Sequence, residues 1–202
     1  MDAQYNIRLV TETDVNGILE IYKPYVMNTA ITFEYEVPSP DEYLQRIKTN
    51  TTEYPWLVCL QDGKILGYTY AGKHRYRKAY QWSPESTIYL DSEIHGRGIA
   101  RILYETLFSI LKLQGYFNVY AAAILENDRS VFFHRALGFE EIGIFKKVGY
   151  KLGNWHDTAW FQLTLVAHID NPKDPKKIIE VTETAAFKSI LREANKRLED
   201  LD

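Results

Sequence analysis

The sequence has only one cysteine, Cys59, among its 202 residues. A lone cysteine cannot form an intramolecular disulfide or a zinc site built from several thiolates. Nothing in the chain therefore requires an oxidising compartment, and we expect it in the cytoplasm. Cys59 lies in the apolar run 57–60, which indicates a buried strand position. Because a nucleophilic thiol needs a nearby base that the sequence does not offer, we do not expect a ping-pong mechanism through cysteine.

Long apolar runs and a basic surplus are also absent. No run approaches the roughly 20 residues that span a bilayer, and the N-terminus MDAQYNIRLV does not resemble a signal peptide. We expect a soluble, unprocessed chain with no membrane partner. The net charge of −3 argues against a nucleic-acid partner, because such proteins neutralise phosphates with excess lysine and arginine. The histidines do not fall at metal-ligand spacings, so no metal is expected.

The residues that are present suit one packed domain, with 46% hydrophobic and 14% aromatic residues. Alternation over 5–10 predicts a strand, and capping residues at 11–14 predict a helix after it. Pro24 should end or kink this helix near Lys23. A capping box at the start of 39–50 predicts a second helix over that range.

The middle of the chain predicts a hairpin and then a strand, a glycine loop and a helix. Residues 56–72 form two apolar runs around an Asp-Gly turn. Residues 86–90 are β-branched or aromatic, and the loop 95–98 separates them from a helix over 99–115. The apolar run 117–125 is typical of a strand buried on both faces, which implies parallel pairing with 86–90.

The remaining segments complete an α+β plan. A short helix over 127–136 precedes strands over 142–148 and 159–166. Composition then changes, and we expect a domain over 1–168 followed by a linker and an appended amphipathic helix within 169–202. This helix packs either on its own domain or against a second subunit, and its balanced charges argue against membrane attachment.

The glycine loop 95–98 is a candidate phosphate site. A loop that opens a helix offers unpaired N–H groups at the positive end of the helix dipole. A Walker loop would continue with lysine and a hydroxyl residue, but Ile99, Ala100 and Arg101 follow Gly98. A dinucleotide fingerprint would need glycine or alanine at Arg101 and should open the first βα unit. A plain glycine turn into a core helix remains the alternative.

The pattern that does fit is His95-Gly-Arg-Gly98-Ile-Ala100, which resembles the pyrophosphate loop of GNAT acetyltransferases. The family form is arginine or glutamine, two residues, glycine, one residue, then glycine or alanine. Gly98 and Ala100 match, whereas His95 stands where arginine or glutamine is usual. Because backbone amides make most of the phosphate contacts, one changed side chain need not abolish binding.

A second stretch resembles the other GNAT signature. Asn127 is followed after seven residues by His134 and after eleven by Gly138-Phe139. Histidine in place of the family's usual tyrosine is similar to the phosphinothricin acetyltransferases. Within about 7–165, further stretches look like that subfamily, namely Thr32-Phe33-Glu34, Tyr54-Pro-Trp-Leu-Val58, Tyr70-Ala-Gly72, Glu85-Ser-Thr-Ile-Tyr-Leu90, Gly149-Tyr-Lys151 and Trp155-His-Asp157.

The resemblance implies the GNAT fold, a mixed central sheet with a parallel, splayed strand pair and flanking helices. It implies acetyl-CoA as co-substrate, a small amine of the phosphinothricin or methionine sulfoximine type as acceptor, direct attack in a ternary complex, and a homodimer. By analogy, backbone N–H groups of Tyr89 and Leu90 stabilise the oxyanion. The implied cofactor-binding positions are Ile88, Tyr89, Leu90, His95, Gly96, Arg97, Gly98, Ile99, Ala100, Arg101 and Asn127.

Amide formation needs a neutral amine, because an ammonium ion has no lone pair, so a base must remove a proton. The resemblance assigns this role to Glu85, and His134 is a candidate proton donor for the leaving thiolate. A solvated loop carboxylate and a packed helix histidine are the alternatives. Arginines suit the carboxylate and polar head of such a substrate, and a solvated basic loop is the alternative. The predicted substrate contacts are Phe33, Arg75, Arg77, Trp155 and His156.

Two other functions stay open. One is acetylation of a polyamine, an aminoglycoside or a protein N-terminus, against which the basic run 75–78 argues mildly. The other is an acyl-CoA-binding module without catalysis, against which the presence of both Glu85 and His134 argues.

Overall fold

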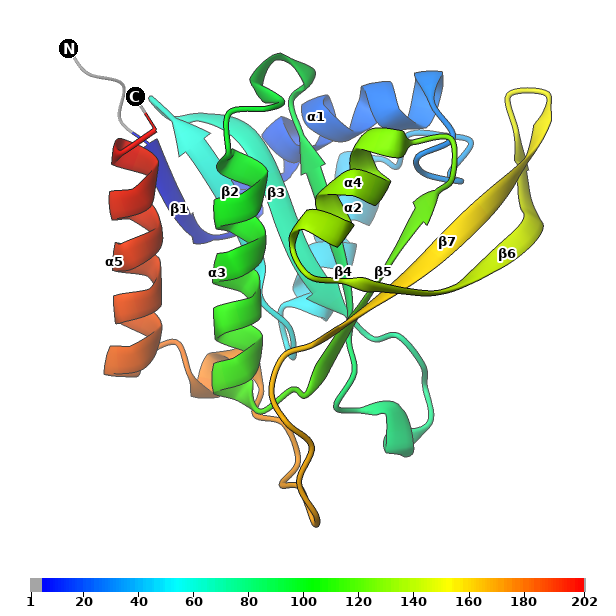
Figure 1. The fold of residues 1–202 in the computed structure, drawn as a ribbon. Helices are drawn as coiled ribbons and strands as arrows, with labels where there is room; N and C mark the ends of the chain where they lie inside the picture. Colours follow the sequence, from blue (N-terminus) through cyan, green and yellow to red (C-terminus); the bar gives the residue numbers. More distant parts are fainter. Residues whose placement is uncertain (1–4, 202) are drawn as a thin grey trace.

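A seven-stranded sheet forms the centre of the molecule (Figure 1). The structure is a computed structural model and describes residues 5–201. The strands are β1 (Tyr5–Leu9), β2 (Trp56–Gln61), β3 (Lys64–Gly72), β4 (Glu85–Leu90), β5 (Asn118–Ile124), β6 (Glu140–Lys151) and β7 (Asn154–Thr164). The α-helices are α1 (Val15–Asn28), α2 (Pro40–Asn50), α3 (Ile99–Gln114), α4 (Asp128–Ala136) and α5 (Ala185–Glu199).

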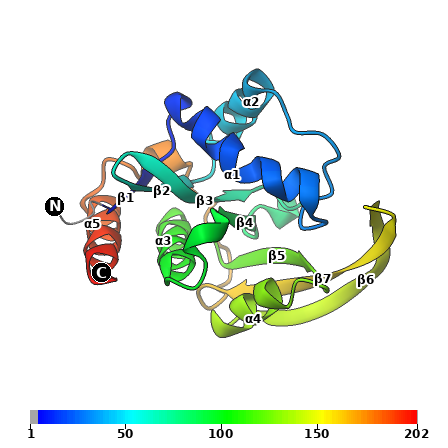
Figure 2. The ribbon, with the colours of Figure 1, turned by 90° about the horizontal axis from the view of Figure 1, so that it is seen from above.

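The strands run in the order β1-β2-β3-β4-β5-β7-β6, and only the central pair β4 and β5 is parallel. Helices α1 and α2 cover one face of the sheet, and α3 and α4 cover the other (Figure 2). Each face has its own apolar core: α1 and α2 pack on β2 and β3, while α3 packs on strands from across the sheet. The predicted α+β fold is confirmed.

The parallel strands β4 and β5 are paired at one end and diverge along the rest of their length. Within the described residues, the pairing of β4 with β5 is confined to Glu85 and Tyr120, while β4 pairs with β3 along its whole length. The Ser86 hydroxyl lies 3.3 Å from the Tyr120 carbonyl oxygen and closes this end of the gap. Toward Leu90 the strand has no β5 neighbour, and a wedge opens between the two strands. The predicted splayed pair is therefore confirmed.

Pro24 was predicted to end or kink helix α1 near Lys23; the helix does not end there but continues through Pro24 to Asn28. Proline removes one helical hydrogen bond and disfavours a helix interior. Here the helix buries Ile18, Tyr22 and Val26 against the sheet, on both sides of the proline. Burial of Val26 contributes about 1.5–3 kcal/mol and so offsets much of the roughly 3 kcal/mol that a proline inside a helix costs.

Strands β6 and β7 are longer than predicted and join in one hairpin. The turn between them is Leu152-Gly153, with φ of 51° and 80°, which is the left-handed backbone of a two-residue hairpin turn. Leucine is unusual in that conformation, so local turn chemistry did not signal the hairpin. The hairpin of β6 and β7 extends well beyond the body of the sheet in Figure 1.

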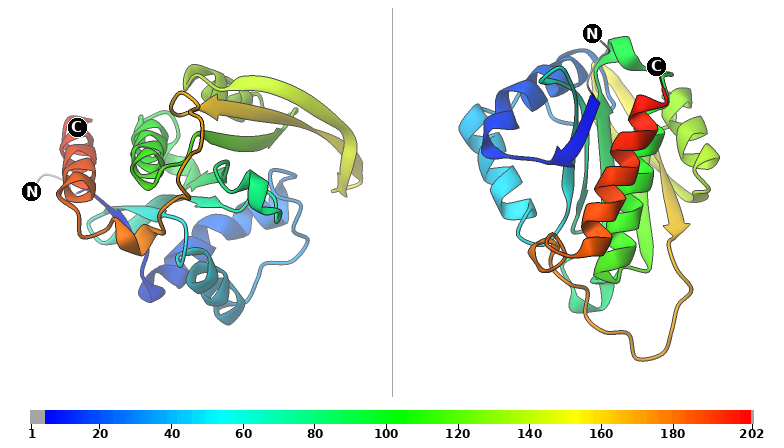
Figure 3. Two further views of the ribbon diagram at one scale, coloured as in Figure 1. Left: turned by 90° about the horizontal axis from the view of Figure 1, so that it is seen from below. Right: turned by 90° about the vertical axis from the view of Figure 1, so that its left-hand side faces the viewer.

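Helix α5 lies beside α3 at the β1 edge of the sheet (Figure 3). Its residues Phe187, Ala194 and Leu198 are buried in the same core as α3. Asn195 accepts a hydrogen bond from the Ile7 N–H at 2.5 Å and donates one to the Ile7 carbonyl at 3.1 Å. Of the two expected placements for this helix, the structure supports packing on its own chain, where it covers the edge strand.

Cys59 lies in β2 with no exposed surface, as expected. Burial raises the pKa of its thiol to about 12, so the group stays protonated and is a poor nucleophile. Among the helices of residues 5–201, none has the length and apolar character needed to cross a membrane. In that same part of the chain, no cluster of histidine, cysteine or acidic side chains could hold a metal ion.

Candidate active site

The glycine loop borders a groove of about 570 Å³ at the open end of the wedge between β4 and β5. Gly96 and Gly98 both have φ of 84°, a backbone conformation that favours glycine. Within residues 5–201, the N–H groups of Gly98, Ile99 and Ala100 donate to no backbone carbonyl. They are the free donors of the first turn of α3, and they suit an anionic group.

Most of the predicted cofactor residues line this groove. They are Ile88, Leu90, His95, Gly96, Gly98, Ile99, Ala100, Arg101 and Asn127. Tyr89 and Arg97 are not among its lining residues, and Tyr89 instead lines the neighbouring pocket. The Arg101 guanidinium already contacts Glu105 at 3.3 Å and the Ala136 carbonyl at 3.1 Å. Its charge is therefore partly engaged within the protein.

A second pocket of about 250 Å³ lies further into the wedge and contains Glu85, Phe33 and His134. Four residues line both this pocket and the groove, namely Ile31, Ile88, Asn127 and Ser130. The two cavities are therefore neighbours along one path, from the glycine loop to Glu85. We call the outer part the groove and the inner part the acyl pocket.

Glu85 stands at the closed end of the wedge, because it is the β4 residue that pairs with Tyr120 of β5. Its side chain is 35% exposed, and one oxygen lies 3.4 Å from Nδ1 of His74. The His74 ring stacks on Tyr120, with centroids 4.8 Å apart, which fixes its position beside the carboxylate. A partly solvated carboxylate at a pocket wall can accept a proton directly or through a water molecule.

His134 is 3% exposed and stacks on Phe161, with ring centroids 5.3 Å apart. Its Nδ1 lies 2.7 Å from the Ser130 carbonyl oxygen, which can only accept, so Nδ1 carries the hydrogen. Nε2 then has the lone pair, and no partner for it exists among the described residues. Burial lowers the pKa of His134, so the resting ring is neutral. This geometry presents an acceptor and does not support the predicted proton donor.

Tyr104 on α3 also lines the acyl pocket, and sequence reasoning missed it. Its hydroxyl lies 3.5 Å from the Ser86 hydroxyl. Burial raises the pKa of Tyr104, so the phenol stays protonated and remains a hydrogen-bond donor. The only signal in the sequence was its place on the apolar face of the helix, which indicates a core residue.

The structure brings Phe33 and His156 together at the mouth of the acyl pocket. Phe33 lines the pocket, and the His156 ring lies behind it, with centroids 6.3 Å apart. Nζ of the buried Lys151 donates to the Thr32 carbonyl at 2.7 Å and ties this segment to the hairpin. Trp155 instead packs against Tyr150 with 59% of its surface exposed, and it lines neither cavity.

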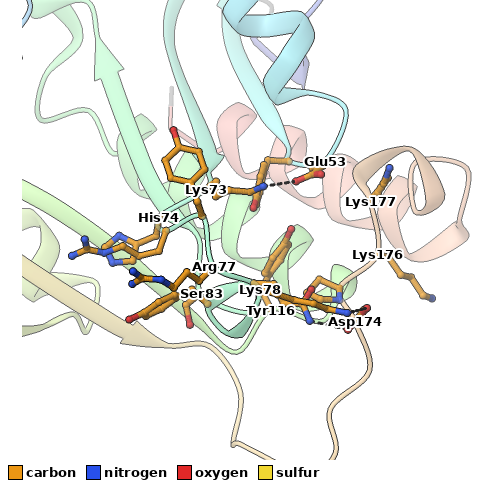
Figure 4. A pocket seen from close by; sticks show the side chains of 16 residues that line it. Glu53, Lys73, His74, Arg77, Lys78, Ser83, Tyr116, Asp174, Lys176 and Lys177 are labelled. Carbon is orange, nitrogen blue, oxygen red and sulfur yellow. Dashed lines mark hydrogen bonds and ion pairs between the residues drawn. The ribbon is translucent and has the colours of Figure 1, made fainter.

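Arg75 and Arg77 line a different pocket, of about 350 Å³, between the β3–β4 connection and the C-terminal segment (Figure 4). Two ion pairs cross it, Lys73 with Glu53 at 3.9 Å and Lys78 with Asp174 at 3.4 Å. The predicted arginines are therefore not residues of the acyl pocket. The two cavities approach each other at His74, which lines this basic pocket and contacts Glu85.

His95 contacts two residues that also line the groove, Tyr25 of α1 and Arg129 of α4. Neither was among the predicted site residues. Arg129 lies two positions after Asn127, so the second signature brought it close in sequence, but no rule of spacing connects it to His95. The histidine at the usual arginine or glutamine position is thus part of a side-chain network at the groove.

Residues 7–160 match the family model of an acetyltransferase (GNAT) domain. The chain belongs to the GNAT acetyltransferase family. The resemblance found in the two sequence signatures is confirmed, and the sheet with its splayed parallel pair is the fold of this family. The chain is an acetyltransferase of the GNAT type.

Relatives of this GNAT chain include enzymes of the expected subfamily. It is 33% identical to the phosphinothricin N-acetyltransferase of Streptomyces viridochromogenes, over 88% of this chain and 94% of the relative. It is 28% identical to the methionine sulfoximine/methionine sulfone acetyltransferase of Salmonella typhimurium, over 80% and 95%. The crystal structure of a phosphinothricin acetyltransferase from Sinorhizobium meliloti in complex with AcCoA is similar, with a TM-score of 0.79, 33% identity, and coverage of 87% and 98%.

Proposed function

We propose that the protein transfers an acetyl group from acetyl-CoA to the amine of a small amino-acid-like substrate. The substrate class is that of phosphinothricin and methionine sulfoximine, which relatives of this chain are named for. The observation that carries the proposal is the continuity of the groove and the acyl pocket, which share lining residues and end at Glu85. The reaction belongs in the cytoplasm under this proposal, because acetyl-CoA is a metabolite of the cell interior.

The groove fits the co-substrate in two respects. The free N–H groups of Gly98, Ile99 and Ala100 suit its phosphates, and the unpaired side of β4 toward β5 suits its amide-containing arm. Asn127 lines both cavities, and its Nδ2 has no partner among residues 5–201, so it can donate to a bound amide. When bound, acetyl-CoA supplies the activated thioester.

The residues of the acyl pocket would act on the amine. Glu85 removes its proton, directly or through water, so that the lone pair attacks the thioester within a ternary complex. Tyr104 retains its proton and can donate a hydrogen bond to the departing sulfur, which the unprotonated Nε2 of His134 cannot do. His134, with a free lone pair on Nε2, is suited to accept a hydrogen bond in the pocket.

Recognition of the rest of the substrate would fall to groups around Glu85. Phe33 forms an apolar wall of the acyl pocket, and His156 supports it from behind. The basic pocket lies beyond His74, and Arg75 and Arg77 would reach a substrate carboxylate only where the substrate extends past Glu85. An anionic head group fits such surroundings better than a polyamine does.

Coenzyme A release with a panel of acceptors tests the substrate class. We expect turnover of phosphinothricin, methionine sulfoximine and methionine sulfone, and none of spermidine or an aminoglycoside. Preferential use of spermidine would contradict the proposal. Binding of acetyl-CoA without transfer to any acceptor would favour the alternative of a non-catalytic module. Intersecting initial-rate lines are expected for a ternary complex, whereas parallel lines would indicate a covalent acetyl-enzyme.

Replacing Glu85 by glutamine tests the base. The substitution keeps the size of the side chain and removes its basicity, so kcat should fall by roughly 10²–10⁴ with an unchanged Kd for acetyl-CoA. Glu199→Gln, in the last turn of α5 and lining neither cavity, is the matched control and should behave as wild type. Full turnover by Glu85→Gln across the pH range would remove Glu85 from this role.

We also propose that the protein is a homodimer that uses the hairpin of β6 and β7. Strand β6 is an edge strand whose residues Ile142, Phe145 and Val148 are about half exposed. Exposed apolar side chains on an edge strand are typical of an interface. Light scattering should show twice the chain mass, and Phe145→Asp should halve it. Ile179→Asp, at an exposed isoleucine elsewhere, should stay dimeric, and a monomeric wild type would refute the proposal.

A further inference from the structure

A directed series of hydrogen bonds ends at the groove. Arg129 Nη1 lies 2.6 Å from His95 Nδ1, His95 Nε2 lies 3.2 Å from the Tyr25 hydroxyl, and that hydroxyl lies 2.6 Å from the Leu90 carbonyl. A guanidinium can only donate and a carbonyl can only accept, so both ends fix the direction. His95 Nδ1 is therefore the acceptor, and Nε2–H donates to Tyr25.

This arrangement requires a neutral imidazole. Burial and the charge of Arg129 both lower the pKa of His95, which keeps Nδ1 free to accept. His95 thus cannot act as a cation toward a phosphate, as an arginine at this position would. In the structure, His95 accepts a hydrogen bond from one N–H of Arg129. This bond fixes the position of the Arg129 side chain on α4.

Arg129 is the charged group that this network presents. It is exposed, lines the groove, and makes no ion pair with any carboxylate of residues 5–201. It is the second residue of α4, across the groove from the free N–H groups of Gly98 and Ile99. After the bond to His95, four of its five N–H groups remain available.

We propose that Arg129, positioned by His95, supplies the side-chain cation for the phosphates of acetyl-CoA. In the family signature an arginine or glutamine at position 95 stands at this site. In this chain the cation comes from α4, and His95 is a positioning residue. The inference rests on the proposed binding of acetyl-CoA and concerns which side chain contacts its phosphates.

Arg129→Ala should weaken binding of coenzyme A by about tenfold, the range of a partly exposed charge-assisted hydrogen bond. Titration calorimetry with coenzyme A measures this. Pantetheine, which has no phosphate, should bind wild type and variant equally in an NMR titration. Arg135→Ala is the matched control, because Arg135 lies on the same helix, pairs with Glu141 at 2.9 Å, and does not line the groove.

The double variant His95→Arg/Arg129→Ala returns the cation to the family position and should regain most of the affinity for coenzyme A. Unchanged affinity of Arg129→Ala, or equal losses for coenzyme A and pantetheine, would overturn the inference. If the double variant folds but regains no affinity for coenzyme A, positions 95 and 129 do not share one role in binding its phosphates. Failure of the proposed binding of acetyl-CoA gives a different result, since wild type itself would then not bind coenzyme A. A failure of acetyl transfer alone would appear in the coenzyme A release assay and would leave these binding comparisons unchanged.

Discussion

Gly149 on β6 lies directly beneath the ring of Phe33, and this contact allows a sharp test of the acyl pocket. A Cβ at Gly149 would lie 2.7 Å from Cε1 of Phe33 and closer still to two other ring carbons. Carbon atoms in good contact are about 3.5–4.0 Å apart, so the ring must move by about 1 Å in Gly149→Ala. Phe33, which is 38% exposed, lines the acyl pocket, whereas Gly149 does not, so a displaced ring changes the shape of that pocket.

The size of the effect follows from this movement. If the ring were fixed, overpacking would cost about 1–3 kcal/mol of stability, but its exposed edge allows relief, so we expect less than about 1 kcal/mol. Displacement of the ring disturbs an apolar wall of the pocket, and such a wall is worth about 1–3 kcal/mol in a specific pocket, so kcat/KM should fall roughly tenfold or more. The Kd for acetyl-CoA should not change, because Phe33 does not line the groove.

Steady-state kinetics with methionine sulfone and a thermodynamic cycle provide the assay. If Gly149 acts only through Phe33, then Gly149→Ala should have no further effect in a Phe33→Ala background, since the ring that it displaces is gone. Gly143→Ala, on the same strand with nothing near its Cβ position, is the control. Wild-type kcat/KM in Gly149→Ala, or additive losses in the double variant, would refute the reasoning.

Two further predictions concern stability. Asn195→Ala removes two hydrogen bonds to Ile7, and the higher helix propensity of alanine offsets part of this loss. The variant should be less stable by about 1.5 kcal/mol, or roughly 3–6 °C in calorimetric Tm. Glu193→Ala, at an exposed position of the same helix, should change Tm little, and equal Tm values for Asn195→Ala and wild type would contradict the role of α5. Burial holds the pKa of His134 below its usual value near 6.5, so its contribution to stability is full above that pH and falls on acidification, as the unfolded chain binds the proton first. His134→Phe should lose less stability than wild type between pH 7 and pH 5 in urea unfolding, and an identical pH dependence would show that His134 is not the source.

The order of strands and helices was predictable because hydrophobic periodicity and caps are local signals. Ser39 caps α2 and accepts from the Glu42 N–H at 3.2 Å, which is one half of the predicted capping box, while the Glu42 carboxylate pairs with Arg46 at 2.6 Å. Predictions failed where distant contacts outweighed local preference. Pro24 stays helical because residues on both sides of it are buried, and the Leu152-Gly153 turn adopts its conformation because β6 and β7 pair along their length.

The predicted site residues lie together where they belong to strand β4 and the glycine loop. Glu85, Ile88 and Leu90 reach the cavities because they follow one another on a single strand. Arg75 and Arg77 are near Glu85 in sequence but belong to a connection that leads to another pocket. Nearness along the chain predicts nearness in space only within one element, since a connection can turn its side chains in any direction.

The histidine at position 95 shows why a signature compared one position at a time can mislead. The chemical requirement is a side-chain hydrogen-bond donor near the phosphates, and the backbone does not dictate which residue supplies it. In this fold, Arg129 comes within 2.6 Å of His95 although 34 positions separate them, because α3 and α4 begin on opposite sides of one groove. The departure at His95 is therefore not evidence against a phosphate site. It becomes intelligible only together with Arg129, and the two positions should be substituted and compared as a pair.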